Sequence, residues 1–188
     1  MSKEKRIKNS PARSIALVGM MAATVECAKL ILSALPNIEV VTILIAIYSY
    51  SFGALGVIAS FVFVFIEPLI YGFGTWTITY IIYWPSLAVL FMIIGKMKIK
   101  NRVVITSAAL TMTIWFGVLS TLVDIGLLSG FFDNFFYRFG VYYLRGIPFY
   151  IAQLAINAVL FPLLFRYITD RLEKYNLNRL HQQKRRNS

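Results

Sequence analysis

Glu67 is the residue whose chemistry is hardest to reconcile with its surroundings. It lies in the stretch IEPLIYGFGTWTITYIIYWP (66–85), where most other side chains are apolar or aromatic. Burying one charged group in the middle of a membrane costs roughly 2.5–3.5 kcal/mol on insertion scales. Further polar and charged residues, Glu39 among them, fall near the same predicted ends of apolar segments. We therefore expect these side chains to line a water-filled hollow or to pair with each other.

Aromatic residues follow Glu67 at helical spacing. Tyr71 comes one turn after it, and Trp76, Tyr80 and Trp84 then succeed one another at intervals of four residues. A belt of aromatic residues at the membrane interface explains Trp76. It explains Tyr80 and Trp84 less well, because they lie about 6 and 12 Å deeper at 1.5 Å per residue. This column favours a pocket that stacks a flat, partly apolar ligand, with Glu67 hydrogen-bonding its polar edge.

Polar residues in other segments could complete this pocket. Asn37 follows Pro36, which ends the first apolar segment, so Asn37 either caps the next helix or faces the outer rim. Gln153 and Asn157 are one turn apart and either join helices by hydrogen bonds or form the floor of the pocket. The predicted ligand-binding residues are Asn37, Glu39, Glu67, Tyr71, Trp76, Tyr80, Trp84, Asn134, Arg145, Gln153 and Asn157.

Enzyme chemistry has little support in the sequence. It contains no G-x-x-x-x-G-K-[ST] phosphate-binding loop. Its only histidine, His181, lies in a basic tail far from the apolar segments, and its only cysteine is Cys27. A metal site or a serine–histidine relay is therefore unsupported. We expect no catalytic residue, no metal and no cofactor.

The composition predicts the fold class. Hydrophobic residues make up 59% of the 188 residues and occur in blocks that are apolar on every face. Blocks of roughly 20 such residues are long enough to cross a membrane as helices. We predict an all-α integral membrane protein, a compact bundle of six transmembrane helices over 12–167, with basic tails at 1–11 and 168–188. The expected helices are 12–34, 38–50, 53–71, 76–95, 103–128 and 141–167, and Pro148 predicts that the last of them restarts near Gly146.

The number of spans depends on whether 38–71 contains one helix or two, because YSFG (50–53) is a weak break. Basic residues cluster before the first helix, between 95 and 103, and after 167. Such clusters stay in the cytoplasm, so both termini should lie there, which requires six crossings rather than five. Anionic lipid explains the basic tails, and we expect no nucleic acid partner.

The first predicted helix carries a stripe of small residues on one face. Small residues allow two helices to approach closely in lipid. The stripe either packs against a helix of the same chain or docks a separate membrane subunit. It consists of Ala12, Ala16, Gly19, Ala23 and Cys27.

The combined pattern resembles a known family. A chain of this size with an alanine-rich first helix, LPNIE (35–39) after it and the later GFGTW (72–76) and YIIYWP (80–85) resembles the substrate-binding S components of energy-coupling factor transporters. The resemblance covers essentially the whole chain. It implies a bacterial plasma membrane protein that takes up a vitamin or vitamin-like micronutrient, with cobalamin as the favoured ligand.

The resemblance also implies partners. An S component associates with a transmembrane coupling subunit, itself attached to two ATPase subunits that hydrolyse ATP. Ala12, Ala16, Gly19 and Ala23 would form the docking face. Nickel and cobalt members use an N-terminal histidine, which this chain lacks, so the resemblance implies an organic ligand. The alternative is a structural or regulatory membrane protein whose first helix serves assembly only.

Overall fold

The protein is an all-helical bundle. The computed structural model describes residues 11–33, 39–128, 130–131 and 134–174. Over these residues six α-helices and no strand are present, which confirms the predicted fold class. The helices are α1 (Pro11–Leu32), α2 (Val41–Phe52), α3 (Ala54–Tyr71), α4 (Thr75–Lys96), α5 (Arg102–Leu128) and α6 (Phe135–Leu160).

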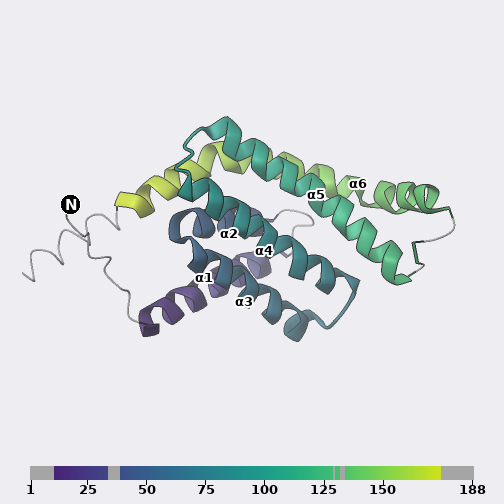
Figure 1. Ribbon diagram of the computed structural model, residues 1–188, viewed down its shortest axis with the longest axis horizontal. Coiled ribbons are helices and arrows are strands. Elements are labelled where there is room, and N and C mark those ends of the chain that lie inside the picture. The colour runs from purple at the N-terminus through teal and green to yellow at the C-terminus, as the bar shows by residue number, and fades with distance from the viewer. Residues whose placement is uncertain (1–10, 34–38, 129, 132–133, 175–188) are drawn as a thin grey trace, which may run out of the picture.

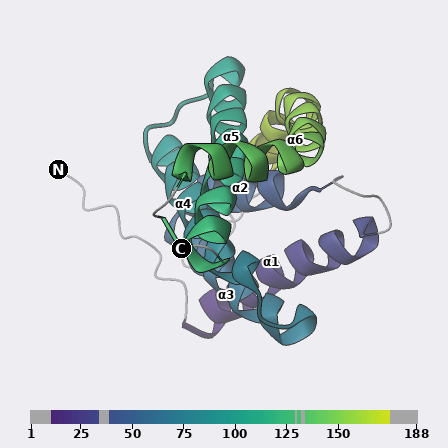
Figure 2. The same cartoon turned by 90° about the vertical axis from the view of Figure 1, so that its right-hand side faces the viewer.

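The helices are arranged as three layered pairs. In Figure 1 and in the perpendicular view of Figure 2, α1 and α3 form one outer layer, α2 and α4 the middle, and α5 and α6 the other outer layer. The start of α1, the link between α4 and α5, and the end of the helix that continues α6 lie at the same end of the molecule, on the left in Figure 1. The described parts of the three basic clusters of the sequence therefore lie at one end of the bundle.

Five of the helices have the length and apolar character of membrane spans: α1, α3, α4, α5 and the continuous helix Phe135–Lys174. These helices support a multi-pass membrane protein. α2 has 12 residues and covers about 18 Å, whereas the hydrocarbon core is about 30 Å thick. Five of the six predicted spans are thus long enough to cross a membrane alone, whereas α2 is too short to do so and contributes to the interior of the bundle.

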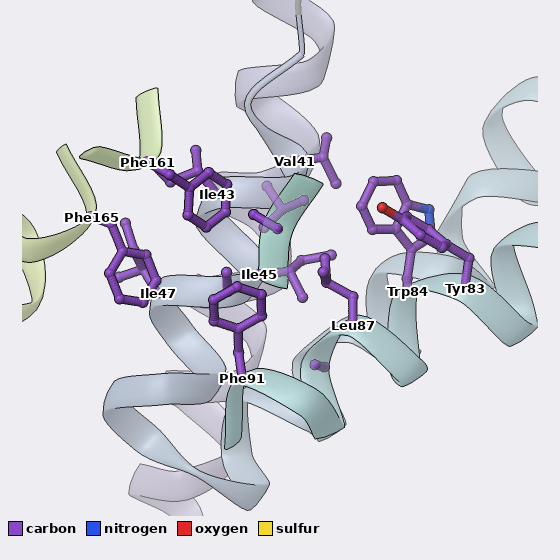
Figure 3. Close-up of a cluster of buried hydrophobic side chains, with 14 of the residues drawn as sticks. Val41, Ile43, Ile45, Ile47, Tyr83, Trp84, Leu87, Phe91, Phe161 and Phe165 are labelled. Atoms are coloured by element: carbon purple, nitrogen blue, oxygen red, sulfur yellow. The ribbon is translucent and has the colours of Figure 1, made fainter. Parts of the chain in front are cut away.

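The core is built around α2. Side chains on all sides of this helix are buried, including Ile43, Ala46 and Ile47, as expected for a helix that is apolar all round. Figure 3 shows Phe161 and Phe165 at one end of the cluster and Trp84 at the other. The two phenylalanines stack with ring centroids 5.6 Å apart.

Two glycines let the backbones of this core approach closely. A Cβ atom at Gly56 of α3 would meet the backbone of Ser49, and one at Gly95 of α4 would meet the carbonyl oxygen of Tyr50. Both neighbours belong to the last turn of α2. Glycine is therefore required where α3 and α4 pack against the end of α2.

The last helix differs most from the prediction. It was expected to begin at 141 and to restart near Gly146, but α6 begins at Phe135 and continues through Pro148. A π-helical segment, η1 (Phe161–Phe165), and a further α-helical stretch then extend it to Lys174. Asn134, with φ 53°, is the left-handed residue that starts the helix. The expected restart is wrong because a helix in a bundle can accommodate proline when neighbouring groups satisfy the freed carbonyl.

Candidate functional site

A partly enclosed cavity lies inside the bundle, and all six helices or their immediate ends contribute to it. Its volume is about 80 Å³. It lies in the half of the bundle opposite the α4–α5 link. The lining residues are Lys29, Glu39, Val41, Thr42, Phe63, Tyr80, Tyr83, Trp84, Thr113, Phe116 and Gln153.

α4 supplies an aromatic wall. Trp76 and Tyr80 make an edge-to-face contact with centroids 5.2 Å apart, and Tyr80 makes a similar contact with Trp84 at 5.6 Å. The predicted column of rings is therefore present. Tyr80 and Trp84 line the cavity, whereas Trp76 extends the column beyond it. The indole Nε1 of Trp84 is buried and has no hydrogen-bond partner among the described residues.

Glu39 supplies a carboxylate to the opposite side of the cavity. It precedes α2 and accepts hydrogen bonds from the backbone N–H of Thr42 at 3.0 Å and from the Thr42 hydroxyl. Thr42 lies three residues later, so Glu39 caps the start of α2 while it lines the cavity. Burial raises the pKa of the Glu39 carboxyl above its ordinary 4.5, and the hydrogen bonds from Thr42 oppose this effect.

Glu67 is buried in protein and paired with a lysine. Its exposed fraction is 1%, and its Oε2 atom accepts a hydrogen bond from the ammonium group of Lys29 on α1. The ammonium group also lies 4.3 Å from the ring centroid of Tyr71 and 5.6 Å from that of Tyr80. Of the two expected arrangements, a water-filled hollow or a pair of polar side chains, the structure shows the pair for Glu67, which faces protein rather than lipid.

Glu26 adds a second acidic group beside this pair. It is 7% exposed and precedes Lys29 by one turn of α1. Its carboxyl group is close enough to Glu67 and Tyr71 to interact electrostatically with both. Two buried acids thus lie beside one ammonium group, whose own side chain is 26% exposed.

Asn157 contacts a residue of the cavity wall. It is 1% exposed, and its Nδ2 atom donates a 3.0 Å hydrogen bond to Oγ1 of Thr113, which lines the cavity. Gln153, one turn earlier on α6, lines the cavity directly. Asn157 thus joins α6 to α5 by a hydrogen bond, whereas Gln153 lies at the wall of the cavity.

Four of the eleven predicted site residues line the cavity, namely Glu39, Tyr80, Trp84 and Gln153. Four others do not line it but contact residues that do: Glu67, Tyr71, Trp76 and Asn157.

The remaining three predicted site residues are Asn37, Asn134 and Arg145. Asn37 lies outside the described residues. Asn134 is exposed at the start of α6. Arg145 is exposed, with its guanidinium carbon 5.9 Å from the ring centroid of Tyr142, and it does not line the cavity. An arginine from this helix therefore does not place a positive charge in the cavity.

Several cavity residues were missing from the predicted set. The most informative of them is Lys29. Its charge within an apolar segment was the one feature of the sequence that could have indicated a role at the site. The contact between Lys29 and Glu67 joins residues 38 positions apart, so helical spacing could not reveal it. The other residues missed at the site are Glu26, Val41, Thr42, Phe63, Tyr83, Thr113 and Phe116.

Comparisons of the chain with protein-family models, curated proteins and solved structures found no match. The cavity and the surfaces of the bundle are therefore the basis for assigning a function.

Proposed function

We propose that the protein is the membrane-embedded binding subunit of an uptake system for a small organic micronutrient. The cavity between the six helices binds the ligand, and α1 docks a transmembrane coupling subunit that is attached to two ATPase subunits. The protein itself has no catalytic role in this proposal. It lies in the bacterial plasma membrane with its basic ends in the cytoplasm.

The observation that carries the proposal is the composition of the cavity wall. Tyr80, Tyr83 and Trp84 offer rings, while Glu39 and Gln153 offer polar groups. Binding sites for small organic molecules combine mostly apolar and aromatic walls with a few polar groups that fix orientation. A bundle with a purely structural role would gain nothing from a buried indole N–H that lacks a hydrogen-bond partner beside a cavity.

The cavity volume narrows the class of ligand. Pockets for drug-sized ligands are about 300–1,000 Å³, and the cavity here is about 80 Å³. A ligand larger than a few water molecules must therefore displace side chains or move helices when it enters. Cobalamin is much larger than this cavity, so the volume favours a smaller vitamin-like molecule.

The outward face of α1 supports a docking role. Ala12, Ala16, Gly19 and Ala23 are all exposed, and no atom lies within 4 Å of a Cβ placed on Gly19. The stripe is thus not used for packing within the described part of the chain. A smooth face of small residues allows a helix of another subunit to approach closely in lipid.

Ligand binding is tested by titrating the purified protein with a panel of vitamins and following tryptophan fluorescence. One vitamin should change the emission of wild-type protein. Trp115 is exposed on α5, so Trp115→Phe should keep the response, and Trp84→Phe should reduce both the response and the affinity. Failure of every vitamin to bind correctly folded protein would contradict the proposal.

Docking is tested by placing a large side chain on α1. Ala16→Trp should leave ligand binding intact and abolish uptake in cells that depend on this protein for the bound vitamin. Ala158→Trp is a matched control, because Ala158 is also an exposed alanine but lies on α6. If the wild type binds no vitamin and Ala16→Trp still prevents assembly with other membrane subunits, the structural or regulatory alternative is favoured.

A further inference from the structure

The ammonium group of Lys29 occupies a cage of aromatic rings and carboxylates. It is bonded to Glu67 and lies 4.3, 5.6 and 6.0 Å from the ring centroids of Tyr71, Tyr80 and Phe63. A cation within about 6 Å of an aromatic centroid is attracted by the ring, more strongly where water is excluded. The cage is therefore built to hold a positively charged group.

Acidic groups outnumber the lysine at the cage. Glu26 and Glu67 both lie beside Lys29, and Glu39 lines the adjoining cavity. Glu26 is 7% exposed, and its carboxyl group is within hydrogen-bonding reach of Glu67 and Tyr71. Two buried carboxyl groups this close share a proton unless a further cation lies beside them, so a cationic group at the cage would interact with both acids.

The cage and the cavity form one continuous site. Lys29, Phe63 and Tyr80 belong to the cage and also line the cavity. Trp84, at 5% exposure, lines the same cavity with its unbonded indole nitrogen. A molecule in the cavity could thus place one end in the cage without crossing any other layer of the bundle.

We propose that the ligand carries a permanent or protonated positive charge, and that this group replaces the Lys29 ammonium between Glu67 and the rings of Phe63, Tyr71 and Tyr80. The inference rests on the proposed function and specifies the chemical class of its ligand, an organic cation. In the absence of ligand, Lys29 fills the cage as an internal substitute.

Lys29 can leave the cage because it lies at the edge of the site. Its side chain is 26% exposed, and it belongs to the last turn of α1. A long, flexible lysine stem can redirect its charged end toward water while its methylene groups stay on apolar surface. When a ligand cation replaces the Lys29 ammonium group, a positive charge therefore remains beside Glu67, and the buried carboxylate of Glu67 is not left unpaired.

The first test compares ligands that differ in charge alone. Choline is titrated against its uncharged carbon analogue, in which a tert-butyl group replaces the trimethylammonium group, with wild-type protein in detergent. Choline should bind at least about tenfold more tightly, since only the cation interacts with the rings and carboxylates. Vitamins that bind should likewise be the positively charged members of the panel.

The second test uses variants of the cage. Lys29→Met removes the internal competitor and should tighten choline binding by about tenfold, whereas Glu67→Gln should weaken it by a similar factor. Lys100→Met is the matched control, because Lys100 pairs with Glu173 at an exposed site and should leave affinity unchanged. If Lys29 instead binds a ligand carboxylate or phosphate, Lys29→Met would weaken binding.

The outcomes separate the two proposals. Tighter binding of the cation and gain of affinity in Lys29→Met support the inference. Equal or tighter binding of uncharged or anionic vitamins overturns the inference and leaves the proposed function in place. Binding of no vitamin and no organic cation overturns both. If Lys29→Met fails to fold, the comparison of charged and uncharged ligands on the wild type alone decides.

Discussion

The Nδ2 atom of Asn157 donates a 3.0 Å hydrogen bond to Oγ1 of Thr113 across the interface of α5 and α6. Thr113 in turn donates a 3.0 Å hydrogen bond to the carbonyl oxygen of Ala109 on its own helix. This chain of hydrogen bonds fixes the hydroxyl of Thr113 at the wall of the cavity. The interface is thus both a structural contact and a boundary of the candidate site.

Removal of either partner should destabilise the bundle modestly. Asn157→Leu and Thr113→Val should each lower the free energy of unfolding by about 1 kcal/mol, as found for hydrogen bonds between membrane helices. Because both changes remove the same bond, the double variant should be less destabilised than the sum of the two. Additive effects in unfolding measurements in detergent would show that the two side chains do not interact.

Gly95→Ala should be strongly destabilising. A Cβ at this position would meet the carbonyl oxygen of Tyr50, and backbone cannot move aside as a flexible side chain does. Overpacking of this kind typically costs about 1–3 kcal/mol. Gly140→Ala is the matched control, because nothing lies within 4 Å of a Cβ there. A melting temperature of Gly95→Ala equal to that of Gly140→Ala would contradict the close approach of α2 and α4.

The ion pair of Lys29 should matter more than an exposed pair. Lys29→Met leaves the carboxylate of Glu67 buried, and such a change costs roughly 3 kcal/mol or more for a buried pair. Lys100→Met breaks the exposed pair with Glu173 and should cost about 1 kcal/mol or less. Glu67→Gln combined with Lys29→Met should recover part of the loss. Thermal unfolding of the three variants measures the difference.

Stability should decline with rising pH because of Glu39. Its pKa is raised by burial, so the folded protein holds this proton more tightly than the unfolded chain does. The contribution of this proton to the free energy of unfolding is therefore complete below pH 4.5, the ordinary pKa, and is lost as the pH rises through the raised pKa of the folded protein. Glu39→Gln should flatten this part of the pH profile, whereas Glu173→Gln, at an exposed acid, should not. An unchanged profile in Glu39→Gln would contradict the raised pKa.

The helices could be predicted because each is a long apolar run with breaks at glycine or charge. The predicted bounds of α3 and α5 are within one residue of those in the structure. The restart of α6 near Gly146 was predicted from Pro148, whereas the helix begins at Phe135 and continues through this proline while it packs against α5.

The site could be predicted in part. Trp76, Tyr80 and Trp84 share one face of one helix, so their spacing was sufficient to place them in a column. The contact of Lys29 with Glu67 depends instead on how α1 packs against α3, which no local pattern encodes. Arg145 was assigned to the pocket by the resemblance to S components, and the structure places it on the exposed surface.

The central claim is that the cavity beside Trp84 holds a small organic molecule. Mass spectrometry of small molecules that co-purify with the protein tests it most directly, with Trp84→Ala compared with Trp115→Ala at an exposed position. We expect one organic compound at near-stoichiometric amount in the wild type and in Trp115→Ala, and its loss from Trp84→Ala. The absence of any such compound from the wild type, or its equal retention in Trp84→Ala, would contradict the account.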